Sequence, residues 1–244
     1  MLKVNQVTKS FSGIVAVNQC SFDIKIGTIS ALIGPNGAGK TTLFNCISRI
    51  YPIDSGEIYF NDERLDLLPT HKIASLGIGR SFQITRTLDE LSVTENLALH
   101  TSAGVGTHLL KPCITKQDKI RANDVMEFLG ISSLADQDMG NLSYGQKKLL
   151  DLGTVLMSDP DLILLDEPAA GVNLRLLEDI IEKLDALRKL GKTILLIEHN
   201  MDMVMGVSDA IVVMSAGSVI AKGKPKEIQN NSEVLNAYLG KSEE

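Results

Sequence analysis

The stretch from Gly34 to Thr42 constrains the fold of this chain most, because it fits the pattern G-x-x-x-x-G-K-[ST]. An apolar run at residues 28–33 comes directly before it and predicts a buried strand. Residues 42–48 predict the first turns of a helix. A glycine-rich loop between a strand and a helix turns successive backbone N–H groups toward an anion. The sequence therefore predicts an α/β fold with a phosphate-binding loop.

The side chains of this loop suit a magnesium nucleotide. Lys40 can reach the β- and γ-phosphates as a point charge, and the Thr41 hydroxyl is a hard oxygen ligand for Mg²⁺. Thr42 can donate to a phosphate. A chance glycine loop is the alternative, and the flanking strand and helix argue against it. The predicted nucleotide-binding residues of the loop are Gly34, Pro35, Asn36, Gly37, Ala38, Gly39, Lys40, Thr41 and Thr42.

Composition limits the remaining function classes. The chain has 244 residues, enough for one large domain or two lobes. Its net charge of −6 is not that of a protein that coats nucleic acid. No apolar run approaches the roughly 20 residues that span a bilayer, and the N-terminus lacks the apolar core of a signal peptide. The 3 cysteines form no C-x-x-C pair, so we expect neither a disulfide framework nor a zinc site, and a reducing compartment.

The order of the predicted elements indicates a core with a helical insert. Alternating residues at 2–9 and 15–26 predict a hairpin with its turn at Ser12 and Gly13. Further predicted strands are 57–60, 77–82, 161–165, 193–197 and 210–214; predicted helices start at 68 or span 93–100, 116–129, 144–157 and 174–190, with a loop at 104–112. Apolar strands that alternate with helices favour a mainly parallel sheet covered on both faces.

Two carboxylates follow one of the buried strands. Asp166 and Glu167 come after residues 162–165, so they should lie at the edge where ligands bind in open α/β sheets. Asp166 can hold Mg²⁺ directly or through water, and Glu167 can polarise a water that attacks the γ-phosphate. A strand that simply ends in polar residues is the alternative.

Three other positions have two interpretations each. Ser143 is a good N-cap and Gly145 leaves backbone N–H groups bare, so this helix start is either an ordinary one or a second phosphate reader, which need not read the nucleotide of its own subunit. His199 also follows a buried strand and is either structural or a sensor beside the phosphates. Phe11, at the first hairpin, is either a core residue or a ring that stacks on adenine.

These motifs, in this order, resemble the nucleotide-binding subunit of ABC transporters over nearly the whole chain. The resemblance implies an α/β P-loop NTPase of ABC type: a RecA-like mixed sheet core with an N-terminal antiparallel β region and an α-helical subdomain. Residues 1–244 would form one ATPase domain, with the core at 1–83 and 159–244 and the helical subdomain at 84–158.

The same resemblance implies a role for each matching residue. Phe11 looks like the aromatic that stacks on adenine, and Gln83 like the glutamine that touches Mg²⁺ and couples to the membrane subunit. Glu167 resembles the catalytic base and His199 the switch histidine. Thr41, Gln83 and Asp166 would hold the magnesium. Ser143, Tyr144, Gly145 and Gln146 match the signature that closes over the ATP of the opposite subunit.

Two departures from the common pattern narrow the resemblance. Tyr144 stands where glycine is common, and Asn173 stands where many members carry aspartate. With residues 198–202 and 237–240, the run 168–173 looks like the ATPases of branched-chain amino-acid importers, whose relatives import urea and short-chain amides.

The importer resemblance implies partners and a location. The partners are a second, homologous or identical ATPase subunit, two integral membrane permease subunits and, indirectly, an extracytoplasmic substrate-binding protein, with no nucleic acid. The location is peripheral, on the cytoplasmic face of the inner membrane. Two other classes stay open, a non-transport cytosolic ABC ATPase that serves as an assembly factor and a P-loop kinase, although a kinase has no use for the signature.

Overall fold

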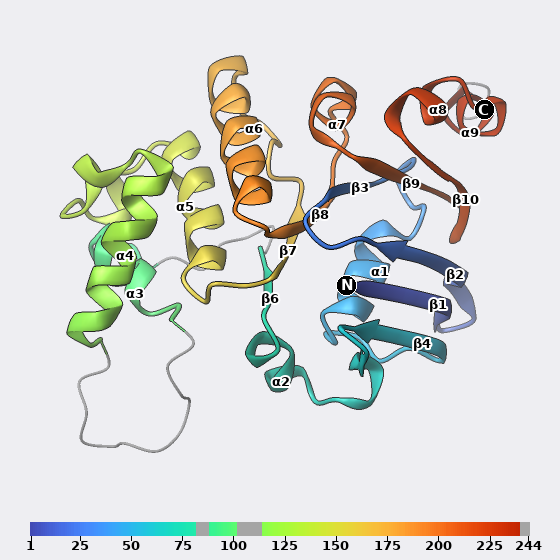
Figure 1. Cartoon of the computed structure of the whole chain (residues 1–244), viewed down its shortest axis with the longest axis horizontal. Helices are drawn as coiled ribbons and strands as arrows, with labels where there is room; N and C mark the ends of the chain where they lie inside the picture. The colour runs from blue at the N-terminus through green and yellow to red at the C-terminus, as the bar shows by residue number, and fades with distance from the viewer. Residues whose placement is uncertain (82–87, 102–113, 240–244) are drawn as a thin grey trace.

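The computed structural model describes residues 1–81, 88–101 and 114–239, and contains two β-sheets flanked by helices (Figure 1). The first sheet is antiparallel, with strand order β2-β1-β4-β5. Its strands are β1 (Leu2–Phe11), β2 (Ile14–Ile24), β4 (Ser55–Phe60) and β5 (Glu63–Arg64). The hairpin turn between β1 and β2 lies at Ser12 and Gly13, which both have positive φ, as the turn chemistry predicts.

The second sheet is the larger one, with strand order β10-β9-β3-β8-β7-β6. Five of these strands are parallel, and β10 runs antiparallel to β9 at one edge. Its strands are β3 (Ile29–Ile33), β6 (Ile78–Arg80), β7 (Leu162–Asp166), β8 (Thr193–Ile197), β9 (Ala210–Ser215) and β10 (Ser218–Gly223). This mixed sheet beside an antiparallel one confirms the predicted α/β architecture.

Helices cover both faces of the larger sheet. Figure 1 shows α1 between the two sheets, α6 and α7 on the other face, and α3, α4 and α5 grouped beyond β6 and β7. The helices are α1 (Lys40–Ile47), α2 (Thr70–Ser75), α3 (Val93–Ala98), α4 (Lys116–Leu129), α5 (Tyr144–Leu156), α6 (Leu174–Lys189), α7 (Met201–Val207), α8 (Pro225–Gln229) and α9 (Ser232–Leu239). Single 3₁₀ turns occupy Leu65–Leu67, Ser132–Leu134 and Met139–Asn141.

The alternation of side chains in the parallel strands divides the interior into two hydrophobic cores. In β3, Ile29, Ala31 and Ile33 face the core shared with α3 to α9, whereas Leu32 faces the core shared with α1 and the antiparallel sheet. All of these side chains are buried. Phe44 of α1 lies in the second core, so the helix that follows the phosphate loop is packed between the two sheets.

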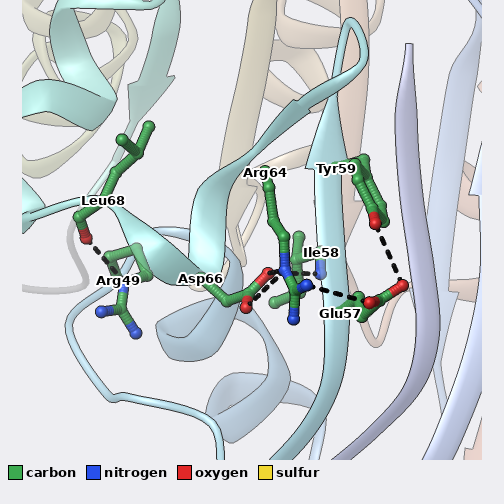
Figure 2. A network of polar contacts seen from close by, with 7 residues as sticks. All are labelled: Arg49, Glu57, Ile58, Tyr59, Arg64, Asp66 and Leu68. Atoms are coloured by element: carbon green, nitrogen blue, oxygen red, sulfur yellow. Dashed lines mark hydrogen bonds and ion pairs between the residues drawn. The ribbon is translucent and has the colours of Figure 1, made fainter.

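A polar network lies at the β4–β5 edge of the antiparallel sheet (Figure 2). The Asp66 carboxylate accepts a hydrogen bond from the backbone N–H of Ile58 at 3.0 Å and pairs with the Nε of Arg64 at 3.0 Å. Arg64 also pairs with Glu57 at 3.0 Å, and the hydroxyl of Tyr59 donates to the same Glu57. This network fastens β4 to the turn that follows β5.

Most predicted elements lie within a few residues of the observed ones. α4 and β8 have their predicted bounds, and α5 ends one residue earlier than predicted. Glu63 and Arg64 form β5, a strand that the sequence analysis did not predict, because they pair with the end of β4. The predicted loop at 104–112 lies outside the described residues. No helix of the described segments has both the length and the apolar composition to cross a bilayer.

Candidate functional site

Residues from four separate segments line one open cleft at the carboxyl ends of the parallel strands. The cleft has a volume of about 240 Å³. Its walls are Ala16 of β2, residues 36–42 of the phosphate loop and α1, Glu167 after β7 and His199 after β8. The structure therefore brings the predicted phosphate loop, base and switch histidine together, in the place that the strand pattern predicts.

The phosphate loop has the backbone that its glycines permit. Gly34, Gly37 and Gly39 have φ values of +148°, +79° and +95°, a region that side chains disfavour. Lys40 is buried, and its Nζ donates to the carbonyl oxygens of Gly34 at 2.7 Å and Pro35 at 3.0 Å. These contacts hold the ammonium group inside the curve of the loop, where a phosphate would meet it.

The predicted base and histidine contact each other directly. The Nε2 atom of His199 lies 3.1 Å from Oε1 of Glu167, and both side chains are partly exposed in the cleft. The parallel pairing of β7 and β8 explains this contact, because Asp166 is in register with Ile197 and the residues after both strands emerge side by side. The pair can share a proton and can orient a water between it and the loop.

Asp166 lies deeper than Glu167, beside a buried arginine. Its side chain is 4% exposed, and Nη2 of Arg80 is 3.8 Å from Oδ2. Burial raises the pKa of Asp166, and the charge of Arg80 acts against that rise. Arg80 also contacts the hydroxyl of Ser48, and the hydroxyl of Ser81 accepts a hydrogen bond from the backbone N–H of Asp166 at 3.1 Å.

Glu198 is a site residue that the sequence analysis missed. It is 3% exposed, and its Oε1 accepts from the backbone N–H of Ala169 at 2.7 Å. Its Oε2 accepts from the N–H groups of His199 at 2.9 Å and Asn200 at 3.3 Å. Glu198 thus ties the segment after β7 to the segment after β8. Its position after a buried strand, like that of Asp166, was the available signal.

The signature residues start a helix away from this cleft. Ser143 caps α5: its hydroxyl accepts from the N–H of Gln146 at 3.4 Å, and Gln146 Oε1 accepts from the N–H of Ser143 at 2.8 Å. This capping box confirms the predicted N-cap. Tyr144 and Gly145 form the first turn, and the four residues from Ser143 to Gln146 do not line the cleft of their own chain.

The structure does not bring two of the predicted residues, Gln83 and Phe11, into this group. Gln83 is outside the described residues. Phe11 ends β1 and is 39% exposed, with its ring centroid 5.1 Å from that of Tyr51 and 5.3 Å from the Nζ of Lys9. Its ring does not line the 240 Å³ cleft, but it remains accessible to a flat ligand.

Comparisons with known proteins show which family the chain belongs to. A family model described as ABC transporter matches residues 17–170, and one described as branched-chain amino acid ATP-binding cassette transporter matches residues 218–244. The probable branched-chain amino acid transport ATP-binding protein LivG of Archaeoglobus fulgidus is 38% identical, over 98% of this chain and 95% of the relative. The high-affinity LivG protein of Salmonella typhimurium is 38% identical, over 99% and 98%.

Solved structures give the same result. A nucleotide-free ATP-binding cassette of an ABC transporter superposes with a TM-score of 0.90 at 33% identity, covering 98% of this chain and 99% of that one. The ADP conformation of MJ1267, an ATP-binding cassette of an ABC transporter, gives a TM-score of 0.89 at 34% identity, covering 98% of both chains. The chain therefore belongs to the ABC transporter family, as an ATP-binding and ATP-hydrolysing subunit.

Proposed function

We propose that this ATPase subunit energises an importer of branched-chain amino acids. The observation that carries the substrate class is the match of residues 218–244 to the branched-chain amino acid cassette model, together with near full-length similarity to proteins named for that transport. The urea and short-chain amide importers that the sequence also resembles remain an outcome of the test below.

The cleft supports a hydrolysis mechanism in which Glu167 is the base. A water attacks the γ-phosphorus, its proton passes to the Glu167 carboxylate, and the bond between that phosphorus and the β–γ bridging oxygen breaks, which leaves ADP and inorganic phosphate. His199, 3.1 Å from Glu167, orients the base and contacts the γ-phosphate. Lys40 and the N–H groups of the loop stabilise the charge on the phosphate oxygens. Phe11 stacks on the adenine.

The residues that would hold Mg²⁺ are Thr41, Gln83 and Asp166. Asp166 fits this role because its Oδ1 atom is buried and has no hydrogen-bond partner among the described residues, as expected of an oxygen placed for a cation or for water bound to one. Thr41 is an exposed residue at the start of α1 and carries a hydroxyl. A bound magnesium would neutralise charge on the phosphate oxygens.

The assembly that we propose places two ATPase subunits face to face. Ser143, Tyr144, Gly145 and Gln146 of one subunit close over the ATP of the other. Residues 84–158 form the helical subdomain that carries this signature, and residues 1–83 and 159–244 form the core. Closure is coupled to two permease subunits and, through them, to an extracytoplasmic binding protein, with this chain peripheral on the cytoplasmic face of the inner membrane. No nucleic acid takes part.

The test is a purification and uptake experiment with Glu167→Gln, which keeps the size of the side chain and removes its basicity. In the native host, the tagged variant should copurify in Mg-ATP with two polytopic membrane proteins and a second ATPase, and that complex should hydrolyse ATP at least about 100-fold more slowly than the wild-type complex. Deleting the gene should abolish uptake of radiolabelled leucine. Unchanged leucine uptake with reduced urea or amide uptake would refute the substrate class.

A further inference from the structure

One face of α5 contacts the segment that follows β7. Tyr144 and Lys148 are four residues apart in α5, so their side chains lie on the same side of the helix. The hydroxyl of Tyr144 donates to the carbonyl oxygen of Ala170 at 2.8 Å, and the Nζ of Lys148 donates to the carbonyl oxygen of Glu167 at 3.2 Å. Two side chains of one helix thus hold two backbone carbonyls of the same short segment.

The Tyr144 ring fits closely against that segment. A Cβ atom on Gly171 would lie 3.2 Å from the Tyr144 hydroxyl oxygen and 3.3 Å from Cε1, and Gly171 has a φ of +72°. A Cβ atom on Gly145 would lie 2.7 Å from the end of the Leu176 side chain of α6. The first turn of α5 therefore approaches both the segment after β7 and the start of α6, and glycines permit that approach.

Lys148 lies in more confined surroundings than Tyr144. It lines a cavity of about 20 Å³ together with Ser81, Asp151, Asp166 and Pro168, among others. A cavity of that size holds about one water. The backbone near Glu167 consequently has little room to shift without disturbing the Lys148 contact.

The backbone of Glu167 needs such support. Its φ is +52°, the left-handed region that a residue with a side chain rarely adopts. The direction of its carboxylate, and with it the contact to His199, depends on that backbone. A partner on the Glu167 carbonyl fixes one end of the peptide unit, and a partner on the Ala170 carbonyl fixes the turn that follows.

We propose that Tyr144 and Lys148 are positioning residues that hold the base Glu167 in its productive orientation within their own subunit. The inference rests on the proposed role of Glu167 as the base. It gives Tyr144 a contact in its own chain, in addition to the role across the dimer that the signature implies. It also links the position of α5 to the geometry of hydrolysis.

The test is the steady-state ATPase activity of the complex purified through a tag on this chain, with Tyr144→Phe and Lys148→Met. Each variant removes one donor and keeps most of the side-chain volume. We expect kcat to fall about three- to tenfold for Tyr144→Phe and about tenfold or more for Lys148→Met, with KM for ATP within about twofold of wild type. Lys148→Arg, which still donates, should recover most of the activity lost in Lys148→Met.

Matched controls separate positioning from general destabilisation. Tyr59→Phe removes a hydroxyl that donates to Glu57 at 3.1 Å in the antiparallel sheet (Figure 2), and Lys189→Met removes a lysine that pairs with Asp185 at 2.7 Å on α6. Both controls should keep the wild-type kcat. Wild-type kcat in Tyr144→Phe and Lys148→Met, with Glu167→Gln inactive, would overturn the positioning role alone. An active Glu167→Gln would instead overturn the base assignment, and the inference with it.

Discussion

The phosphate loop offers a matched pair of glycines that separates backbone strain from steric contact. Gly37 and Gly39 both have positive φ, +79° and +95°. A Cβ atom on Gly37 would meet nothing within 4 Å, whereas one on Gly39 would lie 2.2 Å from the backbone carbonyl oxygen of Ala16 in β2. Alanine at either position is strained, but only alanine at Gly39 also collides with a strand that cannot move aside as a side chain can.

The two substitutions should therefore lower the free energy of unfolding by different amounts. Left-handed backbone costs alanine about 1–2 kcal/mol at each position. Overpacking against a fixed neighbour adds about 1–3 kcal/mol more at Gly39. Gly37→Ala should thus lower the free energy of unfolding by about 1–2 kcal/mol, and Gly39→Ala by about 2–5 kcal/mol.

Urea unfolding of the nucleotide-free chain, followed by circular dichroism, measures both values. The slope of the free energy against urea concentration should be unchanged, so that the midpoints report stability. Equal destabilisation by Gly37→Ala and Gly39→Ala would refute the reasoning, because it would mean that β2 yields to the new methyl group or that the approach of Gly39 to Ala16 is looser than 2.2 Å implies.

Three further predictions concern stability and reactivity. Asp66→Ala leaves a backbone N–H in the network of Figure 2 without its acceptor, and should lower the free energy of unfolding by about 1–3 kcal/mol in urea melts. Thr115 holds the pKa of Asp118 below its ordinary value, chiefly through its hydroxyl, so the charged carboxylate stabilises the folded chain. This contribution is complete above a pH of about 4 and is lost as the pH falls through the lower pKa of the folded state. The stability difference between wild type and Asp118→Asn should therefore shrink when it is measured from pH 7 to pH 3. Burial raises the pKa of the Cys20 and Cys46 thiols to about 11. At pH 8, before urea is added, at most one of the chain's 3 thiols should therefore react rapidly with a disulfide reagent. Rapid reaction of two or three thiols would contradict the buried placement of Cys20 and Cys46.

Elements with their own start signals could be predicted from the sequence. Thr115 caps α4 and Ser143 caps α5 through capping boxes, and each helix begins at the residue after its cap. α1 differs: it begins at Lys40, two residues before the predicted start, because the left-handed Gly39 serves as its N-cap. A glycine in that role leaves no side-chain signal, so the phosphate-loop pattern locates this helix only approximately.

The rest of the site depends on pairing between distant segments. β5 and β10 are edge strands that gain their strand character from β4 and β9, and nothing in their own residues indicates a partner. Arg80 is one residue of an ordinary strand until the pairing of β6 with β7 brings its side chain toward Asp166. Lys148 is likewise one of two adjacent lysines on α5, and only the packed structure shows that it contacts Glu167.

The backbone of Glu167 shows why the direction of the carboxylate that we propose as the base is a property of the tertiary structure. A φ of +52° costs a residue with a side chain on the order of 1–3 kcal/mol, and it persists only where surrounding contacts over-determine it. Those contacts are the N–H of Glu167 donating to Ile197 at 2.9 Å, and its carbonyl accepting from Lys148 at 3.2 Å and from the N–H of Ala170 at 3.2 Å. They come from β8, α5 and the following turn, so a change in any of the three weakens the support for the left-handed backbone of Glu167. A local sequence pattern can name the carboxylate, but the elements that hold it in place decide where it points.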